Sequence, residues 1–289
     1  MNVKNVKNLL KNYGIRPSKK LGQNFLIDKK VFEKILGTAE LLKTDTILEI
    51  GPGIGNLTLK LAEKVKKVIA IEKDRKMCEI LKKTLQDFNV KNVEIIKEDV
   101  LKIQYGSMAK LLNGYNYKVV ANLPYYITSP IIRKFLEFKK PPEAIVLMVQ
   151  KEVGQRICAS PPKMSVLAVS VQFYADAKII SYVSKKSFWP EPKVDSAIIK
   201  IVPLKVKFSK KFTEKFFEIV RAGFSQPRKQ LINNLSKKLN IKKERVKEWL
   251  LKNKVQPSQR AETLSVDKWQ KLTKTLNPIE KTCQSSSTR

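Results

Sequence analysis

The sequence predicts an α/β protein with a doubly wound, mainly parallel sheet, followed by a smaller all-helical region. Over residues 44–158, short apolar runs alternate with amphipathic segments, and a glycine-rich turn at 51–55 joins the first run to a helix. Past Pro203 the apolar residues recur at helical spacing only. Repeated alternation calls for a sheet with helices on both faces. We therefore expect an α/β domain over 1–203 and a helical domain over 204–289.

The N-terminal region is basic, with ten Lys or Arg and three acids in residues 1–43. Its first apolar positions suit a short amphipathic helix that ends at Gly14. A loop of mixed polar and apolar residues, 19–28, then leads into a second helix with Asp28 as the expected N-cap. By pattern alone, this loop is structural.

The alternating region has five expected strands and four expected helices. The strands are at 46–50, 68–72, 93–96, 117–121 and 144–149, and the helices are near 56–66, 75–87, 130–138 and 151–158. Ligands of such sheets bind at the carboxyl ends of the strands. Gly51 and Asp99 follow two of these strands and Glu72 ends a third, so we expect a ligand site where they meet.

The glycine turn carries the first sign of a cofactor. Gly51, Gly53 and Gly55 allow a tight turn, and the helix that follows presents free backbone N–H groups. This spacing departs from the dinucleotide pattern G-x-G-x-x-G. With Glu49 two residues before the first glycine, it resembles the cofactor loop of S-adenosylmethionine (SAM) methyltransferases. A turn without a ligand is the alternative; Glu72, about 20 residues on where a ribose partner belongs, favours a cofactor.

The charge of the chain predicts a polyanionic partner. Lys and Arg number 58 against 26 Asp and Glu, a formal net charge of +32, and 43% of the residues are hydrophobic. The electrostatic field of such a charge favours binding to nucleic acid, and an anionic membrane surface is the alternative partner. No uninterrupted apolar run approaches the roughly 20 residues of a membrane span, and no signal-peptide core is present.

Cysteine and histidine usage narrows the chemistry. Cys78, Cys158 and Cys283 form no C-x-x-C pair, which predicts a reducing, cytoplasmic location and no metal site. The chain has no histidine. This excludes Ser-His-Asp catalysis and a histidine general base.

The fourth expected strand runs directly into Asn122-Leu123-Pro124-Tyr125. A proline turn before a helix, capped by Ser129, is the structural alternative. The motif resembles the Asn-Pro-Pro-Tyr type motif of adenine-N6 methyltransferases. An adenine amine is a poor nucleophile because its lone pair is delocalised into the ring.

The motif supplies what such an amine needs. The side-chain oxygen of Asn122 and the carbonyl of Leu123 can accept both N–H protons, and Pro124 fixes that carbonyl. Tyr125 offers a stacking face for a base taken out of its helix. The methyl donor is a sulfonium cation, so no base must act first and the missing histidine is no obstacle.

Two further motifs complete a family pattern. Leu21-Gly22-Gln23-Asn24-Phe25-Leu26 precedes the glycine turn, and Phe188-Trp189-Pro190-Glu191-Pro192-Lys193-Val194-Asp195-Ser196 follows the Asn122 motif. With the motifs above, in this order, the chain resembles the ribosomal RNA small-subunit adenine N6,N6-dimethyltransferase family (KsgA type). The similarity extends to about Leu276. Trp189 is bulkier than the residue expected there.

The resemblance implies a Rossmann-like class I SAM methyltransferase with a seven-stranded sheet, and it assigns site residues. The cofactor contacts are Gln23, Asn24, Leu26, Gly51, Gly53, Glu72, Asp99 and Asn122. The catalytic residues are Asn122, Leu123, Pro124, Tyr125 and Phe188. In this assignment Phe188 and Tyr125 sandwich the target adenine, although by pattern alone Phe188 is a core aromatic.

The implied substrate is two adjacent adenosines in the 3′-terminal hairpin of small-subunit rRNA, within an assembling 30S-type particle. The expected enzyme is a monomer that binds neither a membrane nor a metal ion. Residues 204–289 carry 22 basic and 7 acidic residues, or +15, and we expect a disordered tail after Pro278. Candidate RNA contacts there are Arg221, Arg228, Lys229, Asn233, Asn234, Lys237 and Lys238.

Three other functions remain open at this point. One is dimethylation of a large-subunit rRNA adenosine, as in macrolide resistance. Another is a non-catalytic, RNA-binding ribosome-assembly factor, which the intact glycine turn and Asn122 motif disfavour. A DNA adenine methyltransferase is the least favoured, because no segment suggests a DNA-recognition domain.

Overall fold

The protein forms two compact units in a computed structural model that describes residues 3–18, 22–112, 114, 116–124, 127–206 and 208–276. Of the described residues, the first unit takes those up to Gln155 together with Tyr174–Leu204. The second takes Arg156–Phe173 and those from Lys205 onward. The sequence-based division at residue 203 differs from this one in placing 156–173 with the sheet.

Aromatic packing explains the difference. The ring of Phe173 stacks on Phe208 and Phe216, with centroids 4.8 and 4.2 Å apart. The backbone N–H of Met164 donates to the carbonyl of Glu262 at 3.0 Å. The helix α8 (Val166–Gln172) therefore contributes to the core of the helical unit, a contact between distant residues that local periodicity does not indicate.

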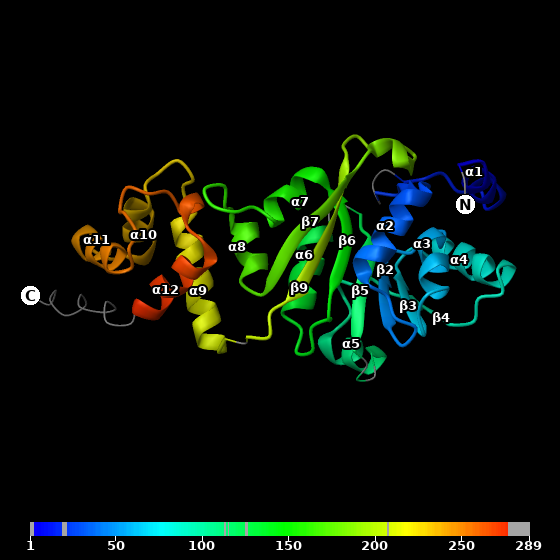
Figure 1. Ribbon diagram of the computed structural model, residues 1–289, viewed down its shortest axis with the longest axis horizontal. Helices are drawn as coiled ribbons and strands as arrows, with labels where there is room; N and C mark the ends of the chain where they lie inside the picture. Colours follow the sequence, from blue (N-terminus) through cyan, green and yellow to red (C-terminus); the bar gives the residue numbers. More distant parts are fainter. Residues whose placement is uncertain are drawn as a thin grey trace, which may run out of the picture. The chain divides into compact units, whose positions relative to one another are not determined.

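The first unit is built on a seven-stranded sheet with the order β4-β3-β2-β5-β6-β9-β7 (Figure 1). The strands are β2 (Thr46–Ile50), β3 (Lys67–Glu72), β4 (Val93–Lys97), β5 (Tyr117–Asn122), β6 (Ile145–Gln150), β7 (Ala175–Val183) and β9 (Ser196–Pro203). The first five are parallel, while β9 is antiparallel to both β6 and β7. The predicted doubly wound sheet is confirmed. Its strand order reverses between β2 and β5, where ligands of such sheets bind.

Helices cover both faces of this sheet. They are α2 (Lys29–Ala39), α3 (Asn56–Ala62), α4 (Arg75–Asp87), α5 (Tyr105–Leu112), α6 (Thr128–Leu136) and α7 (Lys151–Ile157). Apolar residues of α2 and α3 pack on the face that carries Val120 and Ile198. On the opposite face, Gly154 of α7 lies so close to the sheet that an added Cβ would be 3.2 Å from that of Ala197.

Two helix starts test the capping predictions. Asp28 is the N-cap of α2, where its carboxylate accepts the backbone N–H of Lys30, so this prediction is confirmed. The predicted N-cap Ser129 is wrong, because α6 begins at Thr128 with Ile127 in the cap position. The N–H of Ile127 bonds to the carbonyl of Pro124 at 3.2 Å, so the chain turns earlier than the Ser-Pro pair suggests.

The N-terminal segment forms α1 (Val3–Asn12) and β1 (Phe25–Leu26). The helix buries Val6 and Leu10, as its periodicity predicts. The strand pairs antiparallel with β8 (Phe188–Trp189). This pairing joins the two family motifs that lie farthest apart in the sequence.

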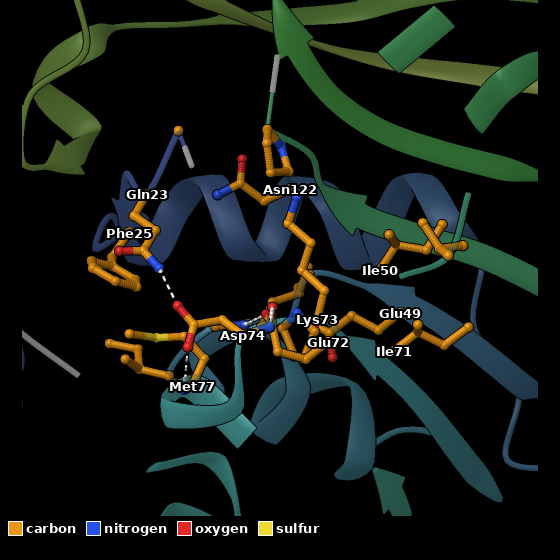
Figure 2. A pocket seen from close by; sticks show the side chains of 18 of the residues that line it. Gln23, Phe25, Glu49, Ile50, Ile71, Glu72, Lys73, Asp74, Met77 and Asn122 are labelled. Carbon is orange, nitrogen blue, oxygen red and sulfur yellow. Dashed lines mark hydrogen bonds between the residues drawn. The ribbon is translucent and has the colours of Figure 1, made fainter. Parts of the chain in front are cut away.

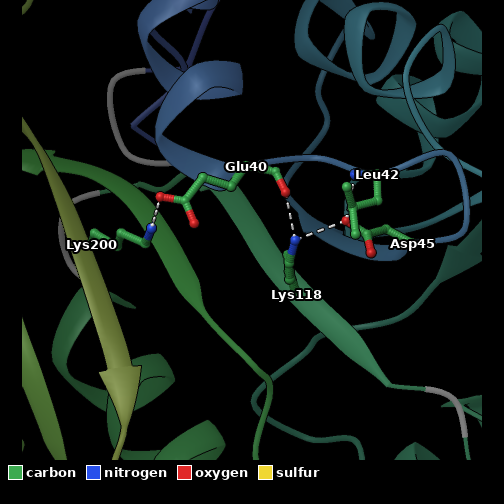
Figure 3. Close-up of polar contacts among 5 residues, drawn as sticks. All are labelled: Glu40, Leu42, Asp45, Lys118 and Lys200. Carbon is green, nitrogen blue, oxygen red and sulfur yellow. Dashed lines mark hydrogen bonds and ion pairs between the residues drawn. The ribbon is translucent and has the colours of Figure 1, made fainter.

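A network of polar contacts stabilises the edge of the sheet formed by the amino-terminal ends of the parallel strands (Figure 3). The ammonium of Lys118 donates to the carboxylate of Asp45 at 2.9 Å and to the carbonyl of Glu40 at 2.8 Å. The carboxylate of Glu40 in turn binds Lys200 at 2.6 Å. The end of α2 is thereby held against β5 and β9, away from the carboxyl ends of the strands.

The second unit contains α9 (Lys210–Gly223), α10 (Leu231–Leu239), α11 (Lys243–Lys252) and α12 (Val266–Thr275). Their predicted apolar stripes are buried at Phe216, Leu235, Trp249 and Trp269. Asn234 is also buried and donates to the carbonyls of Gly223 and Gln226. Its expected RNA contact is therefore wrong, because its amide fastens the loop between α9 and α10. No helix in the described part of the chain is long and apolar enough to span a membrane.

Candidate active site

A pocket lies at the carboxyl ends of β2, β3, β4 and β5 (Figure 2). All eight residues expected to contact the cofactor line it: Gln23, Asn24, Leu26, Gly51, Gly53, Glu72, Asp99 and Asn122. Pro124 lines it as well. The structure thus brings five separate segments together around one cavity, while the role of each residue within it stays a prediction.

The glycine turn shapes one wall of the pocket. Gly53 and Gly55 have φ angles of +56° and +89°, a region that L-residues with a side chain seldom adopt. A Cβ on Gly53 would lie 3.3 Å from the ring of Phe25, and one on Gly55 would lie 2.7 Å from Leu81. The turn therefore lets the β1 segment and α4 close tightly on it.

A chain of hydrogen bonds connects three loops of the pocket (Figure 2). The carboxylate of Glu72 accepts the backbone N–H groups of Gly53 at 3.2 Å and Asp74 at 2.9 Å. Asp74 is the N-cap of α4, and it also accepts the side-chain amide of Gln23 at 3.2 Å. Burial raises the pKa of Glu72, against the effect of these N–H donors.

Asn122 is the last residue of β5 and stands at the rim. Its side-chain nitrogen donates to the carbonyl of Asn24 at 3.3 Å. This contact assigns the orientation of the amide, so its oxygen is the atom that can accept a proton donor. Leu123 turns its side chain into the core and donates its N–H to the carbonyl of Met148 at 3.3 Å. The backbone of the motif is thereby held in place.

The aromatic part of the predicted site is less complete. Tyr125 lies outside the described residues. Phe188 is buried, packs with Leu26 and Phe32 in the core, and is not among the residues that line the pocket. Its packing is that of a core aromatic, and its stacking on a target base stays a prediction. Trp189 packs beside the cluster around α1, with the ammonium of Lys7 5.6 Å from its ring centroid.

The pocket is acidic in a strongly basic protein. Among the described residues, five carboxylic acids and one lysine, Lys73, line it; the acids are Glu49, Glu72, Asp74, Glu98 and Asp99. The sequence did not predict Asp74 and Glu98 as site residues. Asp74 lies two residues from Glu72, and Glu98 lies next to Asp99. Their positions just after β3 and β4 could therefore have identified them as site residues.

Glu49 is the most unusual of these acids. Its side chain is 1% exposed, and its Oε2 atom has no hydrogen-bond partner among the described residues. Burial raises its pKa to about 8; the hydroxyl of Thr58 opposes this effect, and the nearby charge of Glu72 adds to it. A buried carboxylate without a full set of partners is costly when ionised. A cationic ligand would lower that cost.

These residues fit SAM, which carries an ammonium and a sulfonium group. Carboxylates attract both cations, whereas the phosphates of a dinucleotide would be repelled by the ionised acids of the pocket. Glu72 and Asp99, at the ends of adjacent strands, suit the ribose hydroxyls and the adenine amine. No group of three or more Cys, Asp or Glu within the described ranges is arranged to hold a metal ion.

Replacing Glu72 with Ala should weaken SAM binding by about 1.5–3 kcal/mol, because hydrogen bonds to a charged group contribute on this scale. Calorimetric titration measures the change. Glu79→Ala, which removes an exposed acid of α4, is the matched control and should leave the affinity unaltered. Equal affinity of Glu72→Ala and the wild type would remove Glu72 from the cofactor site.

Comparison with known proteins places the chain. It matches the family described as ribosomal RNA adenine dimethylase over residues 15–278. A relative from Clostridioides difficile (strain 630), named ribosomal RNA small subunit methyltransferase A, is 41% identical over 275 residues, which cover 94% of each protein.

Two solved structures resemble it along most of its length. The crystal structure of a dimethyladenosine transferase from Plasmodium falciparum has 28% identity and a TM-score of 0.73, and the match covers 88% of this chain and 98% of that one. The 23S rRNA methyltransferase ErmE has 25% identity and a TM-score of 0.72, covering 88% and 100%.

Proposed function

The chain belongs to the ribosomal RNA adenine dimethylase family, and we propose that it dimethylates the N6 atoms of two adjacent adenosines in the 3′-terminal hairpin of small-subunit rRNA. SAM is the methyl donor. The observation that supports this most is the oriented amide of Asn122 at the rim of an acidic pocket. The small-subunit target is favoured over a large-subunit one because the relative named for the small subunit is 41% identical, against 25% for ErmE.

The residues of the chain divide the work between holding the cofactor and preparing the target. When bound, SAM supplies a methyl group on a sulfonium cation. Glu72 holds the ribose and Asp99 the adenine amine. In the first transfer, the side-chain oxygen of Asn122 accepts an N–H of the target amine, and the carbonyl of Leu123 accepts the other. In the second transfer, the monomethylated amine has one N–H left to donate to these acceptors. Both contacts favour a pyramidal nitrogen whose lone pair can attack, and the surplus proton leaves afterwards to solvent.

The substrate form and the location of the enzyme are part of the proposal. We assign the enzyme, as a monomer, to an assembling 30S-type particle in the cytoplasm, where rRNA offers a dense array of phosphates. The net charge of +32 supports an rRNA partner. Arg221, Arg228 and Lys229 are exposed in the second unit, and we assign them to the phosphate backbone.

Methyl transfer to defined RNAs tests the function. The protein is incubated with radiolabelled SAM and either small-subunit particles or large-subunit rRNA, and the labelled nucleotides are mapped. We expect label on N6 of two adjacent adenosines near the 3′ end of the small-subunit rRNA only. Label in the large-subunit RNA would identify the resistance-type activity. RNA binding without label would identify a non-catalytic assembly factor.

Replacing Arg221, Arg228 and Lys229 by Gln in one variant should make the RNA affinity depend less steeply on the salt concentration. Each lost phosphate contact lowers the slope of log affinity against log salt by roughly 0.7–0.9. SAM affinity should not change, because the pocket belongs to the first unit. A variant of two exposed lysines beyond α3, Lys64→Gln with Lys66→Gln, is the control. Equal salt slopes for wild type and triple variant would mean that these cations only solubilise the surface.

A further inference from the structure

The edge strand β7 carries a β-bulge that redirects one aromatic side chain. The register of β7 against β9 shifts by one residue between Ile179 and Ser181. In an uninterrupted ladder, Tyr182 would lie opposite Ser196, but after the bulge it pairs with Ala197. Successive residues of a strand point to opposite faces, so the bulge moves Tyr182 to the other face of the sheet. Bulges beside active sites commonly re-aim a side chain in this way.

On that face, Tyr182 stands next to the first turns of α7. The ammonium of Lys151 lies 5.1 Å from the centroid of the tyrosine ring. The side-chain amide of Gln155 donates to its hydroxyl oxygen at 3.5 Å. The tyrosine is nevertheless 54% exposed. Two polar side chains thus flank a large aromatic ring that remains open to solvent.

The ring lies along the same edge of the sheet as the Asn122 motif. Asn122 pairs with Met148, which pairs with Ile198, and Ile198 pairs with Ser181. Tyr182 is therefore one residue beyond the row of Asn122, toward the carboxyl end of β7, and its side chain points to the opposite face of the sheet from the side chains of that row. Three strand spacings separate the two backbones, about 14 Å. A few nucleotides of single-stranded RNA can span this distance.

The surroundings of Tyr182 suit a polyanion. Lys151 is exposed, and so are Lys186 and Lys193 in the segment that follows β7. Of the acids in these segments, Glu191 pairs with Lys185 at 2.9 Å, and the carboxylate of Asp195 accepts the backbone N–H of Lys185 at 3.1 Å. Glu152, which follows Lys151, is exposed. An exposed aromatic ring beside cations is the arrangement on which single-stranded bases stack, with the phosphates held by the basic groups.

We propose that Tyr182 and Lys151 form a stacking subsite for an unpaired RNA base a few nucleotides from the target adenosine. The tyrosine ring holds the base, and the ammonium of Lys151 holds an adjoining phosphate. The subsite rests on the proposed function, because its ligand is the same RNA. It differs from the proposed catalytic site in that Tyr182 contacts a flanking nucleotide and acts as a positioning residue for the RNA strand.

Affinity for the 3′-terminal RNA of the small subunit provides the first test. Tyr182→Ala should raise the dissociation constant about 5- to 150-fold, the effect of losing one stacked base. Tyr182→Phe should keep the wild-type affinity, because it keeps the ring. The control is Tyr105→Ala, which removes a tyrosine of similar exposure, 49%, with a lysine 5.9 Å from its ring. Tyr105 begins α5, where its ring stacks on that of Phe138 with the centroids 5.5 Å apart.

A fluorescent base locates the contact. RNAs are prepared with 2-aminopurine at each position on either side of the target, and quenching by the full-length protein is measured. We expect one flanking position, outside the target, to be quenched by the wild type and by Tyr182→Phe but not by Tyr182→Ala. SAM titration of each variant should give the wild-type affinity, which shows that the fold is intact.

The outcomes separate the subsite from the proposed function. Wild-type affinity and quenching in Tyr182→Ala would overturn the subsite while methyl transfer by the wild type continued. Loss of affinity in Tyr182→Phe equal to that in Tyr182→Ala would also overturn it, because the hydroxyl and not the ring would then make the contact. Failure of the wild-type protein to methylate this RNA would count against the proposed function instead.

Discussion

Asn122→Ala is expected to lower the rate constant of methyl transfer by about 10²–10³-fold, the loss seen when one oriented polar group is removed from a reacting centre. The side-chain oxygen of Asn122 would act on the amine mainly in the transition state, so affinity for RNA should stay close to that of the wild type. Single-turnover transfer at saturating SAM and RNA measures the chemical step. Saturation removes any effect of the substitution on cofactor affinity.

Asn92→Ala is the matched control for this prediction. Asn92 also donates its side-chain amide to two backbone carbonyls, those of Ala62 and Val65, both at 3.0 Å. It lies before β4, at the amino-terminal edge of the sheet. Its removal should reduce stability and leave the transfer rate unchanged. Retained turnover in Asn122→Ala would refute the assigned role.

The sheet could be predicted where each strand has a local signal. The strands β2, β3, β5 and β6 are near-continuous apolar runs because they are buried in the middle of the sheet, and the edge strand β4 still carries three apolar residues in VEIIK. The predicted bounds of all five lie within one residue of the observed ones. The sequence did not indicate β7, in which Asp176, Lys178, Ile180 and Tyr182 are exposed. The strand has no continuous apolar run, and the alternation of apolar and polar residues over 175–179 breaks at Ile180 and Ser181, where the bulge lies.

The site was predictable in composition but not in arrangement. Motif spacing indicated Gly51, Glu72 and Asn122, since each follows a recognisable strand. The pairing of β1 with β8 could not be predicted from the sequence, because each of these strands has only two residues and so shows no periodicity. For Phe188, the family resemblance and the pattern of the sequence led to different expectations, and its burial agrees with the pattern. The unpaired oxygen of Glu49 depends on three-dimensional packing alone.

The buried carboxyl of Glu49 should make the stability of the protein decrease with pH. Its pKa is raised from the ordinary value of 4.5 to about 8 in the folded state. Between these values the folded protein binds more protons than the unfolded chain, so the free energy of unfolding falls as pH rises through this window. One such group contributes a slope of about 1.4 kcal/mol per pH unit. Below the window, its contribution to stability is fully present.

Denaturant unfolding of Glu49→Gln across this pH range isolates the contribution. The slope should decrease but not vanish, because burial also raises the pKa of Glu72. Glu33→Gln, at an exposed position of α2, should keep the full slope.

Saturating SAM should reduce the slope of the wild type, since a bound cation favours the ionised carboxylates. SAM affinity should accordingly rise with pH in the wild type and rise less in Glu49→Gln. Identical pH profiles of the two proteins, with and without SAM, would show that Glu49 does not titrate in this window.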